Sequence, residues 1–214
     1  MTICIGFISQ KGGVGKSTLS KMLAREYASN GWEVKIADMD TSQGTAYNWN
    51  SRRLRNNIEP AIRVEQFRRV EDVMRVAMTY DLVIFDGAPH ATKETLQIAQ
   101  VCHLVVLPTG ISLDDLEPTV KLAHELKKEG IPRDKIAFAL CRVGNSDPEI
   151  QEAREYIQNA GYLILAGEIP EKTGYRRASD LGKTLTETTH ATLNKQADLL
   201  AQSIINRIQD LTKE

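Results

Sequence analysis

Short apolar runs alternate along the chain with longer stretches in which apolar and polar residues recur at helical spacing. Several runs, such as residues 82–85 and 104–107, consist of β-branched residues, leucine and phenylalanine, which is typical of strands buried on both faces of a parallel sheet. The predicted strands cover residues 3–8, 33–37, 62–64, 82–85, 104–107, 136–140 and 163–169. The predicted helices cover residues 16–30, 69–79, 93–100, 113–129, 148–159 and 192–211.

This alternation predicts an α/β fold with a doubly wound, mostly parallel sheet and helices on both faces. We expect a single domain over residues 1–214, because no linker, repeat or low-complexity segment divides the chain. Ligands bind to such sheets at the carboxyl ends of the strands. The residues that follow each apolar run are therefore the first candidates for chemistry.

The composition favours a soluble globular protein, with 42% hydrophobic and 26% charged residues in a chain of 214. No apolar stretch approaches the 18 residues of a membrane span, and the mean hydropathy is −0.31. The three cysteines, Cys4, Cys102 and Cys141, lie in apolar sequence, which favours reduced core thiols over a disulfide or metal framework. The chain starts without a secretory signal pattern, so we expect a cytoplasmic protein.

A glycine-rich loop follows the first predicted strand and precedes the first predicted helix. Gly12, Gly13 and Gly15 allow backbone N–H groups to turn inward around an anion at a helix N-terminus. Lys16 supplies a point charge for phosphate, and the Ser17 hydroxyl suits Mg²⁺. A surface turn is the alternative, but it explains neither the spacing nor the hydroxyl residue. The pattern therefore predicts a phosphate-binding loop.

The loop departs from the strict G-x-x-x-x-G-K-[ST] pattern, because Gln10 stands at the first glycine and Lys11 adds a second lysine. The segment KGGVGKS resembles the deviant Walker A motif of the ParA/MinD family of P-loop ATPases. This resemblance implies that Lys11 reaches the phosphates of a partner subunit in a nucleotide-sandwich dimer. It also implies a set of ATP-binding residues: Lys11, Gly12, Gly13, Val14, Gly15, Lys16, Ser17 and Thr18.

Two aspartates, Asp38 and Asp40, follow the second predicted strand and precede a glycine-containing loop. Such a pair suits Mg²⁺ and an attacking water in phosphoryl transfer. The segment is similar to the D-x-D-P-Q-G switch I segment of the family, with Thr41 in place of proline. The resemblance implies that Asp40 is a catalytic and metal-site residue, as it implies catalytic roles for Lys11 and Lys16. A turn or helix N-cap aspartate is the alternative.

The fourth predicted strand ends in Asp86, followed by Gly87. Four apolar residues ending in aspartate form a Walker B arrangement, in which Asp86 would hold Mg²⁺ together with Ser17. The segment resembles the family's switch II, and an N-cap is again the alternative. Pro108 and Arg142 follow later strands and are similar to family positions near the nucleotide base, although proline also marks ordinary loops.

Basic residues cluster locally although the formal net charge is −1. Residues 51–69 contain six arginines and two glutamates, and residues 171–183 contain four basic and two acidic residues. Such patches suit contacts with DNA phosphates, whereas the alternative is a solvated face. Residues 169–185 look like a late segment of the family that helps form the DNA-binding surface of partition ATPases. The resemblance implies DNA contacts by Lys172, Arg176 and Arg177.

The last predicted helix carries an apolar stripe, and over residues 192–214 three basic residues are offset by three acidic ones. A membrane-surface helix of the MinD type needs an excess of Lys and Arg. The balance favours packing of this helix on the domain, and we expect no membrane partner.

Taken together, the resemblance implies a DNA-partition ATPase of the short ParA type, without an N-terminal helix-turn-helix domain. Its implied cofactors are ATP and Mg²⁺. ATP would form a homodimer that binds non-specific DNA at the nucleoid, and a small centromere-binding adaptor protein would stimulate slow hydrolysis. Two alternatives stay open: a MinD-like membrane-associated positioning ATPase and a metabolic P-loop enzyme. The second would need an acceptor pocket with a positioned base, and the four histidines are scattered.

Overall fold

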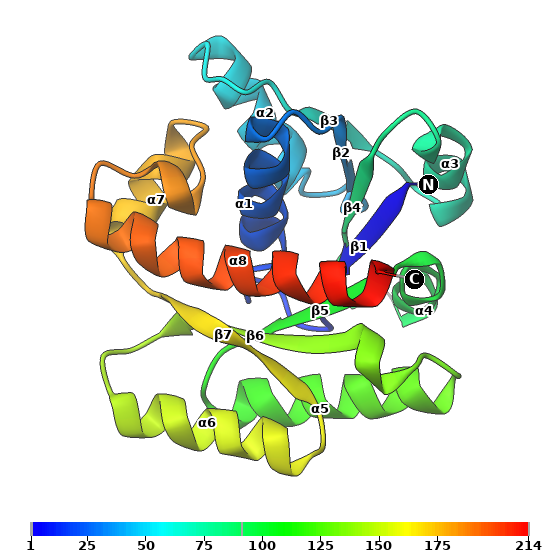
Figure 1. The fold of residues 1–214 in the computed structure, drawn as a ribbon, viewed down its shortest axis with the longest axis vertical. Coiled ribbons are helices and arrows are strands. Elements are labelled where there is room, and N and C mark those ends of the chain that lie inside the picture. Colours follow the sequence, from blue (N-terminus) through cyan, green and yellow to red (C-terminus); the bar gives the residue numbers. More distant parts are fainter. Residues whose placement is uncertain (1, 91, 214) are drawn as a thin grey trace.

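The structure, a computed structural model, describes residues 2–90 and 92–213 and is built around one twisted sheet (Figure 1). Seven strands of the described chain lie in the order β3-β2-β4-β1-β5-β6-β7, and all of their pairings are parallel. The strands are β1 (Ile3–Phe7), β2 (Val34–Asp38), β3 (Arg63–Gln66), β4 (Leu82–Asp86), β5 (Leu104–Thr109), β6 (Ile136–Val143) and β7 (Leu163–Pro170).

Helices cover both faces of this sheet, and the two faces carry separate apolar cores. The first core includes side chains of α1 (Lys16–Ser29), α2 (Thr45–Arg55), α7 (Thr173–Asp180), α8 (Ala191–Thr212) and the short helix η2 (Leu185–Glu187). The second core includes side chains of α3 (Val70–Ala77), α4 (Thr92–Val101), α5 (Leu113–Lys128) and α6 (Asp147–Asn159). A further short helix, η1 (Arg133–Lys135), leads into β6.

The central strands are apolar throughout because each face of the sheet is buried. In β4, Leu82 and Ile84 belong to one core, whereas Val83 and Phe85 belong to the other. Each inward-facing residue on either side removes apolar surface from water, so both sets of positions stabilise the fold. The predicted doubly wound α/β architecture is therefore confirmed, and the sheet is wholly parallel in the described chain.

The first strand, β1, is the central strand of the sheet, and this strand order positions the candidate site. β1 lies between β4 and β5, and the loops that leave these strands meet at their carboxyl ends. Helix α8 packs across β7 and β5 on one face, with its apolar stripe buried (Figure 1). The apolar stripe of α8 is therefore a core-packing face, as the balanced charge of this helix predicts.

The cysteines and the helices agree with the expectation of core thiols and with the absence of a long apolar stretch in the sequence. All three cysteines are buried and free, and burial raises the pKa of Cys4 to about 11 and that of Cys141 to about 12. Thiols with such pKa values are inert core groups. Of the helices that the structure describes, none is long and apolar enough to cross a membrane.

Candidate nucleotide-binding site

The sheet register brings the predicted acidic residues beside the glycine-rich loop. Asp86, the last residue of β4, is paired with Phe7 of β1 and with Asp38 of β2. The chain that leaves Phe7 forms the loop before α1. Three of the predicted segments therefore meet at one edge of the sheet, because their strands are neighbours.

The glycine-rich loop closes around the N-terminus of α1. Gly15 has a left-handed backbone with φ of 115°, and a Cβ atom there would lie 3.0 Å from Cys141 Sγ. Glycine is therefore required on both counts. The loop and the first turn of α1 direct backbone N–H groups and the positive end of the helix dipole to one place, which suits phosphate.

Lys16 is the first residue of α1, and its side chain folds back over the loop. It is only 7% exposed, and its Nζ donates to the Lys11 carbonyl at 3.0 Å. Burial lowers the pKa of Lys16, while Asp86 and Asp40 act in the opposite direction. An ammonium held in this way faces the concavity where the loop would bind phosphate.

Asp86 has the properties of a metal-site carboxylate. It is 2% exposed, and its Oδ1 atom has no hydrogen-bond partner among the described residues. Burial raises the pKa of Asp86 to about 7, and a hydrogen bond from Ser17 acts against that rise. A buried carboxylate oxygen with spare capacity, beside a hydroxyl and a phosphate loop, fits Mg²⁺, which prefers such oxygen ligands.

Asp38 stabilises the fold rather than facing a ligand. Its Oδ2 atom accepts hydrogen bonds from the backbone N–H groups of Ala46 and Tyr47, both at 3.0 Å, and so caps α2. Its Oδ1 atom accepts from the N–H of Asp40 at 3.2 Å. Asp38 is not the N-cap residue of α2, which is Gly44, but it accepts from the first N–H groups of that helix and anchors the loop that carries Asp40.

Asp40 is partly exposed and is held by its own loop. Its Oδ1 atom accepts from Ser42 Oγ at 2.6 Å and from the Gln43 N–H at 3.1 Å. Its charge also affects the pKa of Lys16, so it lies within electrostatic reach of the phosphate loop. The catalytic role of Asp40 stays a prediction.

Lys11 points away from its own phosphate loop. Its Nζ lies 2.5 Å from Asp115 Oδ1 and donates to the Asp114 carbonyl at 3.0 Å, at the start of α5. The side chain remains 45% exposed. The sequence analysis did not single out Asp115, which lies seven residues after Pro108.

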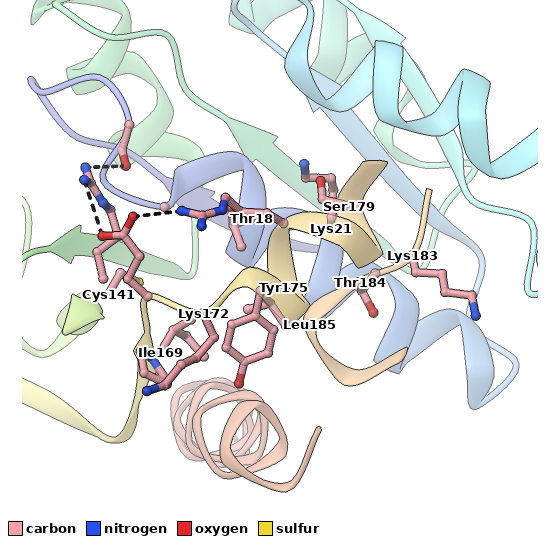
Figure 2. Close-up of a pocket in the computed structure, with 16 residues that line it drawn as sticks. Thr18, Lys21, Cys141, Ile169, Lys172, Tyr175, Ser179, Lys183, Thr184 and Leu185 are labelled. Atoms are coloured by element: carbon pink, nitrogen blue, oxygen red, sulfur yellow. Dashed lines mark hydrogen bonds and ion pairs between the residues drawn. The ribbon is translucent and has the colours of Figure 1, made fainter. Parts of the chain in front are cut away.

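A cavity of about 270 Å³ opens beside the loop, between α1, the end of β6 and the segment from β7 to η2 (Figure 2). Gly13, Gly15 and Thr18 line it from the loop side. At its mouth, Arg142 Nη1 donates to the Gly13 carbonyl at 3.4 Å and its Nη2 lies 3.8 Å from Glu171. Pro108 is buried in β5, behind Gly15.

The predicted DNA-contacting residues lie on or next to α7. Lys172 and Arg176 line the cavity, and Arg176 forms an ion pair with Glu171 at 3.3 Å. Lys172 donates to Asn145 Oδ1 at 2.8 Å. Arg177 is exposed on the same short helix.

The arginines of residues 51–69 do not form one basic surface. Arg53 is fully buried in an ion pair with Glu187 at 2.8 Å. Arg69 pairs with Asp72, and Arg63 lies near Glu33. The expectation of a basic patch is therefore wrong for Arg53. The fold buries this arginine against Glu187, which lies 134 residues away in sequence.

A parallel sheet with a glycine-rich loop before α1, a buried lysine and a buried aspartate on the adjacent strand defines the class of P-loop nucleotide-binding proteins. The chain belongs to the family described as the CobQ/CobB/MinD/ParA nucleotide binding domain, whose model matches residues 5–186. The resemblance of the loop to the ParA/MinD family is thereby confirmed. A comparison with curated proteins gave no significant match.

Solved structures with the same fold include cell-division and partition proteins. The cell division ATPase MinD of Pyrococcus furiosus matches with a TM-score of 0.75 and 21% identity, over 96% of this chain and 99% of its own. MinD of Pyrococcus horikoshii, solved with Mg-ADP, has a TM-score of 0.76 and 18% identity over 100% of both chains. A putative plasmid partition protein of Borrelia burgdorferi, bound to AMPPNP, has a TM-score of 0.71 and 15% identity, over 97% of this chain and 100% of its own.

Proposed function

We propose that this chain is a partition-type ATPase whose ATP-bound homodimer binds DNA without sequence preference and releases it after hydrolysis. Lys16, Ser17 and Asp86 would hold MgATP, and Asp40 would orient the attacking water. The site geometry supports this role because a phosphate loop, a buried ammonium and an orphaned carboxylate oxygen lie together. The similar structures solved with Mg-ADP and AMPPNP support the same ligand class.

The placement of Lys11 supports a dimer. Its ammonium is directed to the exposed start of α5 rather than to its own phosphate loop. A partner subunit's triphosphate would offer the lysine a stronger set of acceptors than Asp115 alone. ATP would therefore favour pairing, whereas ADP lacks the γ-phosphate that this contact needs.

One observation carries the DNA-binding part of the proposal: α7 has one side against the nucleotide cavity and another facing solvent. Tyr175, Arg176 and Ser179 line the cavity, whereas Arg177 is exposed. A ligand in the cavity therefore contacts the helix that carries the outward arginine. The membrane-associated alternative is less well supported, because the apolar stripe of α8 is buried.

The DNA-binding surface leads to a prediction about salt dependence. We expect Arg177→Ala to reduce the slope of log affinity against log salt by about 2, because each of two copies would lose one phosphate contact worth about 0.9. Fluorescence anisotropy with a random duplex, ATP and several salt concentrations measures this slope. The matched control is Arg75→Ala on α3, the other helical layer, which should leave the slope unchanged.

An unchanged slope for Arg177→Ala would remove this arginine from the DNA-binding surface. The same protein is tested by co-sedimentation with anionic vesicles in ATP. Vesicle binding without DNA binding would favour the membrane-associated positioning ATPase and would contradict the proposal. Lys172 and Arg176 also line the cavity, so their variants would not separate DNA contacts from nucleotide contacts.

A further inference from the structure

Lys21 is a second buried lysine on α1, and neither the phosphate loop nor the fold accounts for it. It is 6% exposed. Across residues 2–90 and 92–213, its ammonium has no hydrogen-bond acceptor or ion-pair partner. The contact that it does make is with the Trp49 ring, whose centroid lies 5.6 Å from Nζ.

This environment is unfavourable for an ammonium group. Nζ is not among the fully enclosed side-chain atoms that lack a partner, so it keeps some contact with solvent. A lysine carries three donors, and holding them in a largely buried place without a protein acceptor has a free-energy cost that a cation–π contact only partly offsets. Burial lowers the pKa of Lys21 to about 8, although Asp86 and Asp38 raise it from a distance. For comparison, Lys35 is 7% exposed, and its Nζ lies 2.5 Å from Glu65. Lys21 thus has the burial of a paired lysine without the partner.

The missing acceptor has room in the cavity. Lys21 lines the same cavity of about 270 Å³ as Gly13, Gly15 and Thr18 of the phosphate loop. In Figure 2, Lys21 and Ser179 appear on the opposite side of the view from Cys141. The volume is near the lower end of small-ligand pockets. A ligand that fills the cavity would therefore meet the unpaired donors.

The position of Lys21 along α1 indicates which part of a nucleotide would reach it. Phosphates bind at the N-terminus of the helix, whereas the Cα of Lys21 lies about 7.5 Å beyond that of Lys16 along the axis, and Lys21 Nζ lies over the Trp49 ring of α2. The walls of the cavity include the apolar side chains of Ile169, Tyr175 and Leu185. Such walls suit a ribose and a base better than a triphosphate.

We propose that Lys21 recognises the nucleoside half of the bound nucleotide by donating a hydrogen bond to an acceptor atom of the ribose or base. The inference rests on the proposed function, since it assumes that the loop binds a nucleoside triphosphate. Lys21 would then contribute to binding and to selection between nucleosides. Lys16 would serve the phosphates.

The test compares a complete nucleotide with a ligand that has phosphates alone. Calorimetry measures the affinity of the wild-type protein and of Lys21→Met for MgATP and for magnesium tripolyphosphate. We expect Lys21→Met to weaken the binding of MgATP at least tenfold, the equivalent of about 1.4 kcal/mol, since the variant loses a charged hydrogen-bond donor. Tripolyphosphate affinity should change less than twofold. Lys35→Met removes an equally buried ammonium from β2 and should leave the ratio of the two affinities unchanged.

Equal weakening of both ligands would assign Lys21 to the phosphate site and overturn the inference, as would unchanged binding of MgATP. A wild-type protein that binds neither ligand would instead contradict the proposed function. A second measurement needs no variant: acetylation of wild-type lysines, read by mass spectrometry. MgATP should protect Lys21 and tripolyphosphate should not. Equal labelling of Lys21 with and without MgATP would also overturn the inference.

Discussion

Replacing Lys16 with alanine is expected to abolish measurable ATP hydrolysis. Lys16 is 7% exposed, and the Lys11 carbonyl holds its ammonium over the phosphate loop, where phosphate charge would develop. Removing one preorganised donor of this kind costs about 10² to 10³ in turnover. Because the proposed intrinsic rate is slow, that loss takes hydrolysis below detection in a phosphate-release assay.

The matched control for this prediction is Lys11→Ala. Both lysines belong to the same loop, but Lys11 contacts Asp115 and the start of α5 in the described structure. We therefore expect a single copy of Lys11→Ala to bind MgATP within about threefold of wild type, whereas Lys16→Ala loses at least tenfold, the equivalent of about 1.4 kcal/mol. Wild-type hydrolysis by Lys16→Ala would contradict the assignment of the loop.

Replacing Arg53 with methionine is expected to lower the free energy of unfolding by about 3–5 kcal/mol. The Glu187 carboxylate, whose side chain is 11% exposed, would lose its nearer ion-pair partner and keep only Arg25, at 3.6 Å. Arg53 is fully buried and donates to both carboxylate oxygens of Glu187, at 2.8 and 3.0 Å. It also donates to the carbonyls of Glu59, Pro60 and Gly182. Urea unfolding measures the loss, and Arg55→Met, an exposed change on the same helix, should cost less than about 0.5 kcal/mol.

The ion pair between Arg53 and Glu187 also makes the free energy of unfolding depend on pH. Burial raises the pKa of Glu187, but hydrogen bonds from Arg53 and Thr184 outweigh it and leave that pKa below its ordinary value of 4.5. A lowered folded-state pKa means that the stabilisation is complete above pH 4.5 and is lost as the pH falls through the folded-state pKa. The decrease in the free energy of unfolding at acid pH should be smaller in Arg53→Met than in the wild-type protein. A loss of stability under 1 kcal/mol at pH 7 would contradict the account of the pair.

Arg53 also belongs to a clamp between α2 and the chain that follows α7. Trp49 Nε1, Arg53 Nη1 and Asn56 Nδ2 donate to the carbonyls of Lys183, Gly182 and Leu181, respectively. A Cβ atom at Gly182 would lie 2.3 Å from the Arg53 backbone nitrogen, so the two segments are in close contact. Since Asp38 caps the other end of α2, this helix connects the Asp40 loop to the α7 region.

The sequence was sufficient to predict the sheet and the phosphate loop, because both leave local signals. Strands buried on two faces are continuous apolar runs, and the loop needs its residues at fixed spacing. Helices α2 and α7 were not predicted. The buried face of α2 includes Asn50 and Arg53, and that of α7 has only Tyr175 and Ala178, so neither shows an apolar stripe.

The features that sequence reasoning missed depend on partners far apart in the chain. Arg53 reads as a surface cation until Glu187 is placed beside it. Lys21 reads as a solvated residue of an amphipathic helix until tertiary packing buries it beside Trp49 of α2 and the cavity. Such roles come from tertiary contacts, which spacing along one segment does not encode.

The most direct test of the account is the mass of the protein in each nucleotide state, measured by light scattering on Asp40→Ala, which should bind ATP without consuming it. We expect twice the chain mass of 23.9 kDa with MgATP and the single-chain mass with MgADP. The double variant, with Lys11→Ala combined with Asp40→Ala, should keep the single-chain mass with MgATP. The same mass in MgATP and MgADP would contradict the claim that ATP pairs two copies of this chain.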